Sequence, residues 1–364
     1  MLRVLQVVTD MRRGGLETML MNYYRVIDKN KIQFDFLTHR DYLGDYGTEI
    51  QKLGGKIYHI SRLNPFSPSY KKELNNFFID HPEYQIIHVH QDCMSSVILK
   101  IAKKQGIKVR IAHSHANSQD KNIKYPIKLL YKKWIPKYAT DLLACGKSAG
   151  DWMFKGVQYK ILVNAIDAKQ YRYNIKIREQ IRKELGIAED ELIIGHVGRF
   201  SPAKNHIFLL RIFQRLLKRK NAKLLLVGDG ELKQKIETEI EKLELSGKVL
   251  LTGVRTNIGE LMQVMDVFVL PSIYEGLGIV GVEAQAAGLP CVISENVPDE
   301  AVITKNVRKV ALSDSEDYWV KVILEAEKVE RKDTYNEICE AGYDIENNSV
   351  KLEKYYFDLL KEKE

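Results

Sequence analysis

The chain has 364 residues, of which 45% are hydrophobic and 29% are charged. This composition is typical of a folded protein and excludes a largely disordered chain, and the length favours two domains over one compact core. The formal net charge of +8 indicates an anionic partner, which could be a phosphorylated substrate, an acidic lipid surface or nucleic acid.

No apolar segment approaches the roughly 20 residues needed to span a bilayer, and Met1 leads directly into a strand-like segment without a signal-peptide pattern. We therefore expect a cytoplasmic protein. The cysteines form no Cys-x-x-Cys pair, which predicts buried thiols and neither a zinc site nor a disulfide framework. They are Cys93, Cys145, Cys291 and Cys339.

In the first half of the chain, short β-branched segments alternate with segments of helical length. The predicted strands are 4–8, 32–38, 56–60, 86–89, 109–112 and 141–144. This alternation predicts a parallel sheet covered by helices, a Rossmann-like layout.

The same rhythm restarts after Asp167, which predicts a second doubly wound α/β sheet. Its predicted strands are 192–197, 223–227, 248–251, 267–270 and 291–293. The hinge is expected at 163–167, before a helix at 174–185, and the tail has the apolar spacing of a docked helix. We divide the chain into domains of residues 1–167 and 168–345 and a C-terminal helix of residues 346–364.

Two such sheets are expected to form a cleft at the carboxyl ends of their strands, so the loops after strands are the candidate sites. After the strand 267–270, amides near Gly276 and Gly278 at a helix start form an anion site. Glu275 could bind a transferred sugar and Glu283 a ribose. A helix cap and a solvated side chain would be the simpler explanation for isolated glutamates, but the run Pro-Ser-x-Tyr-Glu-Gly-Leu-Gly favours the site.

The segments Glu275-Gly276-Leu277-Gly278, Glu283-Ala284 and Gly288-Leu289-Pro290 together resemble the Glu-x7-Glu signature of retaining glycosyltransferases of family four. Ala112-His113-Ser114-His115 and 288–294 are most similar to bacterial capsule and exopolysaccharide members. The likeness covers most of the chain and is strongest over 195–300. It implies the GT-B architecture, with two Rossmann-like domains facing across a cleft. The first domain would serve the acceptor and the second the nucleotide-sugar donor, and the C-terminal helix would return to the first domain.

Two cations follow the strand 192–197. Arg199 offers a planar fork and Lys204 a point charge, and both suit a diphosphate, although either could be an ordinary surface side chain. The resemblance implies that these two residues bind the donor phosphates and stabilise the leaving nucleotide. It also implies backbone contacts to the donor, with tight turns as the alternative explanation. These contacts would come from Val254, Arg255, Gly276, Leu277, Gly278 and Ile279.

In the first half, Gly14 and Gly15 follow the first strand, and by the resemblance this loop approaches the donor phosphates and the acceptor. Family members also place a functional histidine after the strand 109–112, near the reacting sugar. We assign this role to His115, with His113 and His90 held in reserve. A hydrogen-bonded structural role is the alternative for each histidine.

The proposed chemistry requires stabilisation of negative charge on a leaving nucleoside diphosphate. The chain contains no Asp-x-Asp tripeptide, the motif that holds a divalent metal in many sugar transferases. We therefore expect no metal and no cofactor, with Arg199, Lys204 and the helix start after Glu275 stabilising the charge. The resemblance implies retention of anomeric configuration, a uridine donor and transfer of a hexosyl or N-acetylhexosaminyl group. His115, Glu275, Arg199 and Lys204 form the predicted catalytic set.

The segment 124–137 mixes lysines with aromatic residues. It is predicted either to rest on an anionic membrane surface, on its inner face, or to be an ordinary helix with one buried aromatic side. The first reading suits a polyprenyl-lipid-linked acceptor, which the resemblance implies beside glycan acceptors in polysaccharide biosynthesis. A nucleotide-sugar epimerase of similar fold is the alternative enzyme. A basic nucleic-acid-binding protein is a further alternative without a recognisable motif, so we expect no nucleic acid partner.

Overall fold

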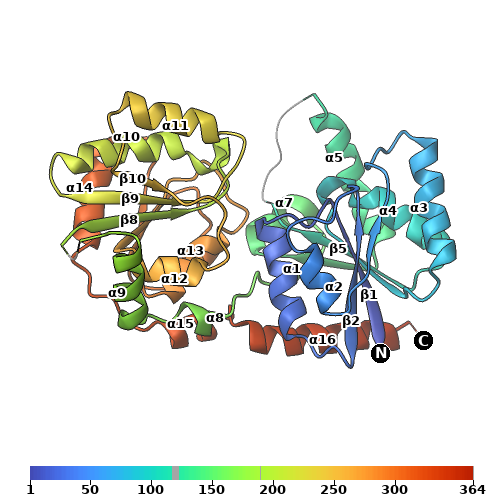
Figure 1. Cartoon of the computed structure of the whole chain (residues 1–364). Helices are drawn as coiled ribbons and strands as arrows, with labels where there is room; N and C mark the ends of the chain where they lie inside the picture. Colours follow the sequence, from blue (N-terminus) through green and yellow to red (C-terminus); the bar gives the residue numbers. More distant parts are fainter. Residues whose placement is uncertain (117–122, 189, 364) are drawn as a thin grey trace. The chain divides into compact units, whose positions relative to one another are not determined.

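The computed structural model describes residues 1–116, 123–188 and 190–363, and the chain forms two compact units (Figure 1). The first unit contains Met1–Ile166 and the C-terminal segment that begins at Ile345. The second unit contains Asp167–Asp344. Both boundaries lie one residue before the expected ones, and the chain leaves the first unit once and returns to it.

The first unit is built on a parallel sheet with the strand order β3-β2-β1-β4-β5-β6-β7. Its strands are β1 (Leu2–Val8), β2 (Ile32–Thr38), β3 (Ile57–His59), β4 (Ile86–Val89), β5 (Val109–Ser114), β6 (Asp141–Ala144) and β7 (Lys160–Ile161). Its helices are α1 (Gly15–Val26), α2 (Gly47–Lys52), α3 (Pro68–Asp80), η1 (Asp92–Met94), α4 (Ser95–Lys104), α5 (Tyr125–Lys133), α6 (Ile135–Tyr138), α7 (Lys147–Phe154) and α16 (Ile345–Lys361).

Alternating side chains of β1 supply two separate cores, as expected for a sheet covered on both faces. Val4 and Val8 pack with residues of α1, α2 and α16, whereas Leu5 and Val7 pack with residues of α3, α4 and α7. Gln6 therefore shares its side of the strand with Val4 and Val8, on the face covered by α16.

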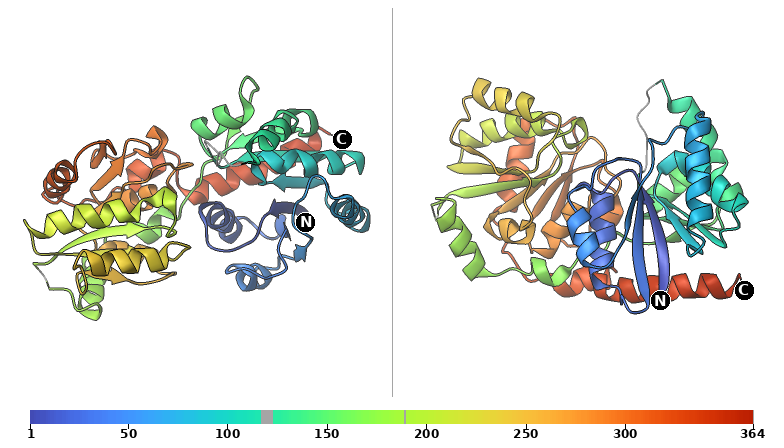
Figure 2. Two further views of the ribbon diagram at one scale, coloured as in Figure 1. Left: turned by 90° about the horizontal axis from the view of Figure 1, so that it is seen from above. Right: turned by 45° about the vertical axis from the view of Figure 1, so that its right-hand side comes forward.

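Helix α16 supplies part of the first core from the far end of the chain. Leu352, Tyr356 and Leu359 are buried at the helical spacing expected from the sequence, and the helix lies alongside α1 (Figures 1 and 2). This confirms the prediction that the C-terminal helix packs on the first domain. The helix begins at Ile345, one residue before the expected start, and the Ile345 amide donates to the carbonyl of Ile166.

The second unit has a parallel sheet in the order β10-β9-β8-β11-β12-β13. The strands are β8 (Leu192–Val197), β9 (Ala222–Val227), β10 (Val249–Leu251), β11 (Val267–Leu270), β12 (Cys291–Ser294) and β13 (Val307–Val310). The helices are α8 (Ala168–Tyr171), α9 (Ile175–Glu184), η2 (Pro202–Lys204), α10 (His206–Leu217), α11 (Lys233–Lys242), α12 (Ile258–Val264), α13 (Ile279–Ala286), η3 (Asp299–Ala301), α14 (Glu316–Ala326) and α15 (Tyr335–Glu340).

Helices cover both faces of this second sheet. Helices α10, α11 and α14 form one layer, and α8, α9, α12 and α13 form the other (Figure 1). The strand order is that of a Rossmann fold. The expectation of two Rossmann-like doubly wound units is thus confirmed.

Candidate functional site

The order of the second sheet reverses between β8 and β11, and ligands of doubly wound sheets bind outside the carboxyl ends of the strands at such a switch point. The loop after β8 carries Arg199 and Lys204, and the loop after β11 carries Glu275. The topology thus brings two segments that are far apart in sequence to one edge of the sheet.

At this switch point Lys204 and Glu275 form an ion pair. The Lys204 Nζ lies 2.5 Å from Glu275 Oε1, and the Ser272 hydroxyl donates to the same oxygen over 2.6 Å. The two charged side chains are only 18% and 10% exposed, so solvent screens the pair weakly. Glu275 is therefore neither solvated nor a helix cap, because Gly278 occupies the cap position of α13.

Gly278 has a left-handed backbone with φ of +79°, a conformation that favours glycine. The turn at Gly278 starts α13, whose first amides project beyond the helix and attract anions. Lys204 and this helix start therefore offer positive charge on neighbouring loops, and the charge suits a diphosphate.

Glu283 lies inside α13 and is buried, which rules out the solvated alternative. Burial raises the pKa of its carboxyl to about 7, and a hydrogen bond from Tyr171 partly opposes this rise. A carboxyl with this pKa changes its charge near neutral pH. It accepts hydrogen bonds from hydroxyl groups best above that pH.

Arg199 belongs to the same loop as Lys204 but is more exposed, and its Nε donates to Glu231 over 3.1 Å. The loop is held against the end of β9 by the amide of Phe200, which donates to the carbonyl of Asp229. A Cβ at Gly228 would lie 2.1 Å from the carbonyl oxygen of Gly198, so this close approach requires glycine. The structure thus directs Arg199 toward Glu231 and Lys204 toward Glu275.

Val254 and Arg255 follow β10, the edge strand of the second sheet, and not one of the two strands at the switch point. Val254 is 56% exposed, and Arg255 donates to Asn257 over 3.2 Å. Their predicted backbone contacts with the donor stay a prediction.

In the first unit, the predicted glycines stand at the start of α1. Gly14 is the N-cap and Gly15 the first helical residue. A Cβ at Gly15 would meet no described atom within 4 Å, so packing within the described residues does not require glycine at this position. The loop after β1 thus leads into the start of α1, where no described atom fills the space beside the Gly15 Cα.

The predicted histidines of the first unit form a buried cluster with a fourth one, His88. His88 Nε2 lies 3.1 Å from His113 Nδ1, and His90 Nδ1 lies 2.8 Å from His115 Nε2. Burial lowers the pKa of His88 and of His115 to about 3 and holds the pKa of His90 and of His113 well below its usual range. All four rings are therefore neutral at physiological pH.

His88, His90 and His113 also place ring nitrogens within 4.8 Å of one another, a spacing that can hold a metal ion. Five of these six nitrogens already take part in hydrogen bonds with neighbouring side chains. The hydrogen-bonded structural role that the sequence left open for each histidine therefore fits His113 and His90. His115 is the most exposed member of the cluster.

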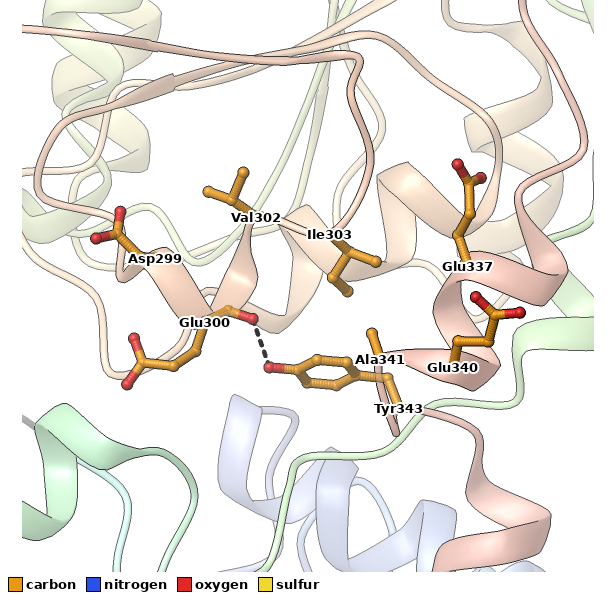
Figure 3. Close-up of a pocket in the computed structure, with 8 residues that line it drawn as sticks. All are labelled: Asp299, Glu300, Val302, Ile303, Glu337, Glu340, Ala341 and Tyr343. Carbon is orange, nitrogen blue, oxygen red and sulfur yellow. Dashed lines mark hydrogen bonds between the residues drawn. The ribbon is translucent and has the colours of Figure 1, made fainter.

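A separate pocket of the second unit has a volume of about 510 Å³ and lies between η3 and α15 (Figure 3). Its lining includes the acidic residues Asp299, Glu300, Glu337 and Glu340, and the Tyr343 hydroxyl donates to the carbonyl of Glu300 over 2.7 Å. The pocket contains none of the predicted site residues, and its carboxylates would repel a diphosphate.

The sequence did not single out Ser272, Gln6 and His88, which contact the predicted residues Glu275, His90 and His113. It also did not single out Tyr356, which contacts Gln6 and His88. His88 could have been found, since His88 and His90 lie two residues apart on and just after β4, as His113 and His115 do on and just after β5. Residues two apart on neighbouring parallel strands share one face of a sheet. Tyr356 gave no such local signal.

Comparisons with known proteins identify the family and the fold. The family model "Glycosyl transferases group 1" matches residues 177–344. The putative glycosyltransferase EpsF of Bacillus subtilis is 36% identical over 97% of this chain and 96% of its own length. A galactosyltransferase of Escherichia coli, named for UDP-Gal and an α-D-GlcNAc-diphosphoundecaprenol acceptor, is 24% identical over 76% of each chain. The capsular polysaccharide biosynthesis glycosyltransferase CapH of Staphylococcus aureus is 22% identical over 84% of each.

Among solved structures, Anabaena Alr3699/HepE in complex with UDP and glucose superposes with a TM-score of 0.81. It is 18% identical and covers 98% of this chain and 100% of its own. This likeness shows the fold, in agreement with the predicted GT-B class. The sequence likeness to EpsF over nearly the whole of both chains confirms the suspected family, so this chain belongs to the group 1 glycosyltransferases, which makes it an enzyme of sugar transfer.

Proposed function

We propose that this glycosyltransferase moves a sugar from a uridine diphosphate donor to a lipid-linked or glycan acceptor in polysaccharide biosynthesis. We further propose that it retains the anomeric configuration and needs no metal ion. The observation that carries the proposal is the buried Lys204–Glu275 pair beside the start of α13. The relatives named for a UDP-sugar with a diphospholipid acceptor and for capsule synthesis support the donor and acceptor classes.

In the proposed reaction, the bond between the anomeric carbon and the diphosphate oxygen breaks, and its electron pair leaves with the nucleotide. The acceptor hydroxyl oxygen bonds to the anomeric carbon on the same face, and its proton passes to the leaving phosphate. Lys204, Arg199 and the first amides of α13 stabilise the growing negative charge. Glu275 accepts hydrogen bonds from the sugar hydroxyls, and Glu283 from the ribose.

His115 would contact the transferred sugar in this scheme and orient it. Its ring is neutral because burial lowers its pKa to about 3. The role proposed for His115 is therefore hydrogen bonding by a neutral imidazole and not donation by an imidazolium.

A donor screen by thermal shift tests the first step. A ligand present at about 100 times its dissociation constant stabilises its binding unit by roughly 2.7 kcal/mol. UDP-sugars should therefore raise the melting transition of the second unit, and GDP- or ADP-sugars should raise it less. Equal shifts with every nucleotide would contradict the uridine assignment.

Turnover with a polyprenyl-diphosphate-linked sugar then tests the reaction, with the product's anomeric configuration read by proton NMR. We expect retention, and we expect full activity after EDTA treatment. Inversion, or loss of activity that Mg²⁺ or Mn²⁺ restores, would overturn the corresponding part of the proposal. An altered donor sugar without transfer would instead mark an epimerase.

We also propose that α5 and α6 rest on an anionic membrane. No described helix is long and apolar enough to cross a bilayer. However, four apolar side chains are exposed at intervals of three or four residues from the turn just before α5 to Trp134 at its end. Exposed lysines lie beside them at Lys124, Lys133 and Lys137. The apolar residues are Ile123 (93% exposed), Ile127 (37%), Leu130 (48%) and Trp134 (38%).

The alternative is an ordinary helix with one buried side. However, α5 has no fully buried residue, and its Tyr131 packs only partly buried against the core of the first unit. Lysines and an aromatic ring around an exposed apolar stripe are typical of interfacial helices.

Flotation with liposomes tests this contact. Binding should need anionic lipid, weaken in salt, and fall in the variant Ile127→Ser/Leu130→Ser/Trp134→Ser. Phe66→Ser/Ile79→Ser removes exposed apolar side chains elsewhere on the first unit and serves as the matched control. Equal flotation of the two variants would contradict the membrane surface.

A further inference from the structure

A buried chain of hydrogen bonds connects Tyr356 on α16 with His115. The Gln6 Nε2 donates to the Tyr356 hydroxyl oxygen over 3.3 Å, and the Gln6 Oε1 lies 3.0 Å from His90 Nε2. His90 Nδ1 in turn lies 2.8 Å from His115 Nε2. The chain thus links the last helix to the histidine predicted to act on the sugar.

The orientation of the Gln6 amide, with Nε2 toward Tyr356 and Oε1 toward His90, sets the direction of each hydrogen bond. An amide oxygen only accepts, so His90 must carry its hydrogen on Nε2. Because the ring is neutral, His90 Nδ1 is then an acceptor, and the hydrogen between the two rings belongs to His115 Nε2. His115 Nδ1 is then the unprotonated, or bare, nitrogen of the ring.

A second branch leaves Tyr356 in the opposite direction. The tyrosine oxygen accepts from Gln6, so its own hydrogen is free to donate to His88 Nδ1 over 2.8 Å. His88 then donates through Nε2 to His113 Nδ1, and His113 carries its hydrogen on Nε2. His113 Nε2 is buried and, like His115 Nδ1, has no hydrogen-bond partner among the described residues.

The end of the first branch is a buried acceptor. His115 Nδ1 is shielded from solvent and has no hydrogen-bond partner among the described residues. A buried polar atom without a partner is costly, and such atoms in native proteins commonly serve a function.

We propose that Tyr356 is a positioning residue, which through Gln6 and His90 fixes His115 as the Nε2–H tautomer and so presents its bare Nδ1 to a donating hydroxyl group. The effect on turnover rests on the proposed transferase function. The tautomer itself does not, because it is a property of the protein alone.

The competing explanation for these histidines is a metal ion bound by His88, His90 and His113, whose ring nitrogens lie within 4.8 Å of one another. A bound ion would take ring lone pairs and break the directional chain. Elemental analysis of the purified protein separates the two, since one equivalent of zinc or another transition metal would overturn the proposal.

The direct test is long-range ¹H–¹⁵N NMR of the full chain with ¹⁵N-labelled histidine, which separates protonated from bare ring nitrogens. The His115 signals are assigned by their loss in His115→Gln. We expect a protonated Nε2 and a bare Nδ1 for both His90 and His115. The opposite tautomer at His115 would overturn the proposal.

Three variants separate the branches. Tyr356→Phe removes the hydroxyl shared by both branches, so the fixed tautomers of His90 and His115 should give way to mixtures. Gln6→Met should disturb His90 and His115 but leave His88 and His113 unchanged, and it serves as a second test if Tyr356→Phe does not fold. The control is Tyr355→Phe on the same helix. The Tyr355 hydroxyl donates to Asp141, which is not part of the hydrogen-bonded network of histidines. Unchanged His115 signals in folded Tyr356→Phe or Gln6→Met would refute the positioning role.

The kinetic counterpart uses the transferase assay. Tyr356→Phe should lower kcat by about tenfold or more and leave the KM for the donor nearly unchanged, because a misplaced catalytic group affects the reacting step more than binding. Tyr355→Phe should keep the kcat of the wild type. If the NMR result holds and kcat does not fall, the tautomer is fixed but His115 is not used in turnover. That outcome overturns the proposed role of Tyr356 in turnover and contradicts the proposed role of His115.

Discussion

Glu275 accepts hydrogen bonds from both Lys204 and Ser272, so a donor phosphate beside Lys204 must share its ammonium with a carboxylate. Lys204→Met should therefore reduce kcat/KM by about 100-fold or more, as does the loss of one charge-stabilising donor in other enzymes. Lys233→Met is the matched control, because the exposed Lys233 forms a surface ion pair with Asp229 over 3.7 Å. Comparable losses in both variants would indicate a general effect of net charge.

Glu283 should make stability depend on pH. Burial raises the pKa of its carboxyl from 4.5 to about 7, so the folded state binds the proton more tightly than the unfolded chain. The free energy of unfolding should then fall as pH rises from about 4.5 through about 7, by roughly 3 kcal/mol at most.

Glu283→Gln removes this dependence on pH. The stability of the variant minus that of the wild type should therefore be larger at pH 8 than at pH 5. Calorimetric melting of the second unit at the two pH values measures the difference. Glu241→Gln, at an exposed position on α11, should behave like the wild type. If the stability of Glu283→Gln differed from that of the wild type by the same amount at pH 5 and pH 8, the raised pKa of the buried Glu283 carboxyl would be contradicted.

At this scale, the sequence predicted Glu275, Glu283 and Lys204 because strand-end loops and a local spacing mark them. Tyr356 could not be predicted in this way. It contacts His88, which is 268 positions away in the sequence. An aromatic residue at helical spacing predicts only that its side chain packs in a core. The hydroxyl's role appears once the helix is packed.

At the scale of elements, Arg331 holds the ends of two helices together. Its guanidinium donates to the carbonyls of Met262 and Gln263 in α12 and of Ala287 after α13, and it lies 4.2 Å from the centre of the Tyr173 ring. Burial lowers its pKa to about 9, and the position of a cation at two helix carboxyl ends offsets part of the burial cost.

Arg331→Met should destabilise the second unit by about 2–4 kcal/mol, because several buried carbonyls lose their donor at once. Arg219→Met, which removes a surface ion pair with Asp317, should cost at most about 1 kcal/mol. Urea unfolding of both variants gives the comparison. Similar midpoints for the two would show that Arg331 does not hold the helices.

The sequence predicted the central strands of both sheets but did not predict two edge strands, β7 and β13. β7 has only two residues, both exposed, and the two central residues of β13 are the exposed Arg308 and Lys309. Charged and very short edges protect a sheet from pairing with other chains. The same property removes the apolar signal by which a strand is predicted.

At the scale of the whole molecule, the two units differ in continuity. The second unit is one uninterrupted segment with its own core, whereas the first core needs Leu352, Tyr356 and Leu359 from α16. A fragment of residues 167–344 should therefore fold alone, and a fragment of residues 1–166 should not.

Circular dichroism and amide NMR of the separate fragments test this difference. Adding a peptide of residues 345–364 should restore a folded spectrum to residues 1–166, and the same peptide with Leu352→Asp should not. A well-folded fragment 1–166 without the peptide would show that α16 is dispensable for the first core.

The return of the chain to the first unit also has a consequence for biosynthesis. Domains commonly fold in the order in which they leave the ribosome, but here the first segment to emerge stays incomplete until the last helix has been made. The second unit can fold while the first still exposes the groove that α16 will fill. A nascent chain arrested shortly before residue 345 should therefore resist protease over its second unit and be cleaved in its first.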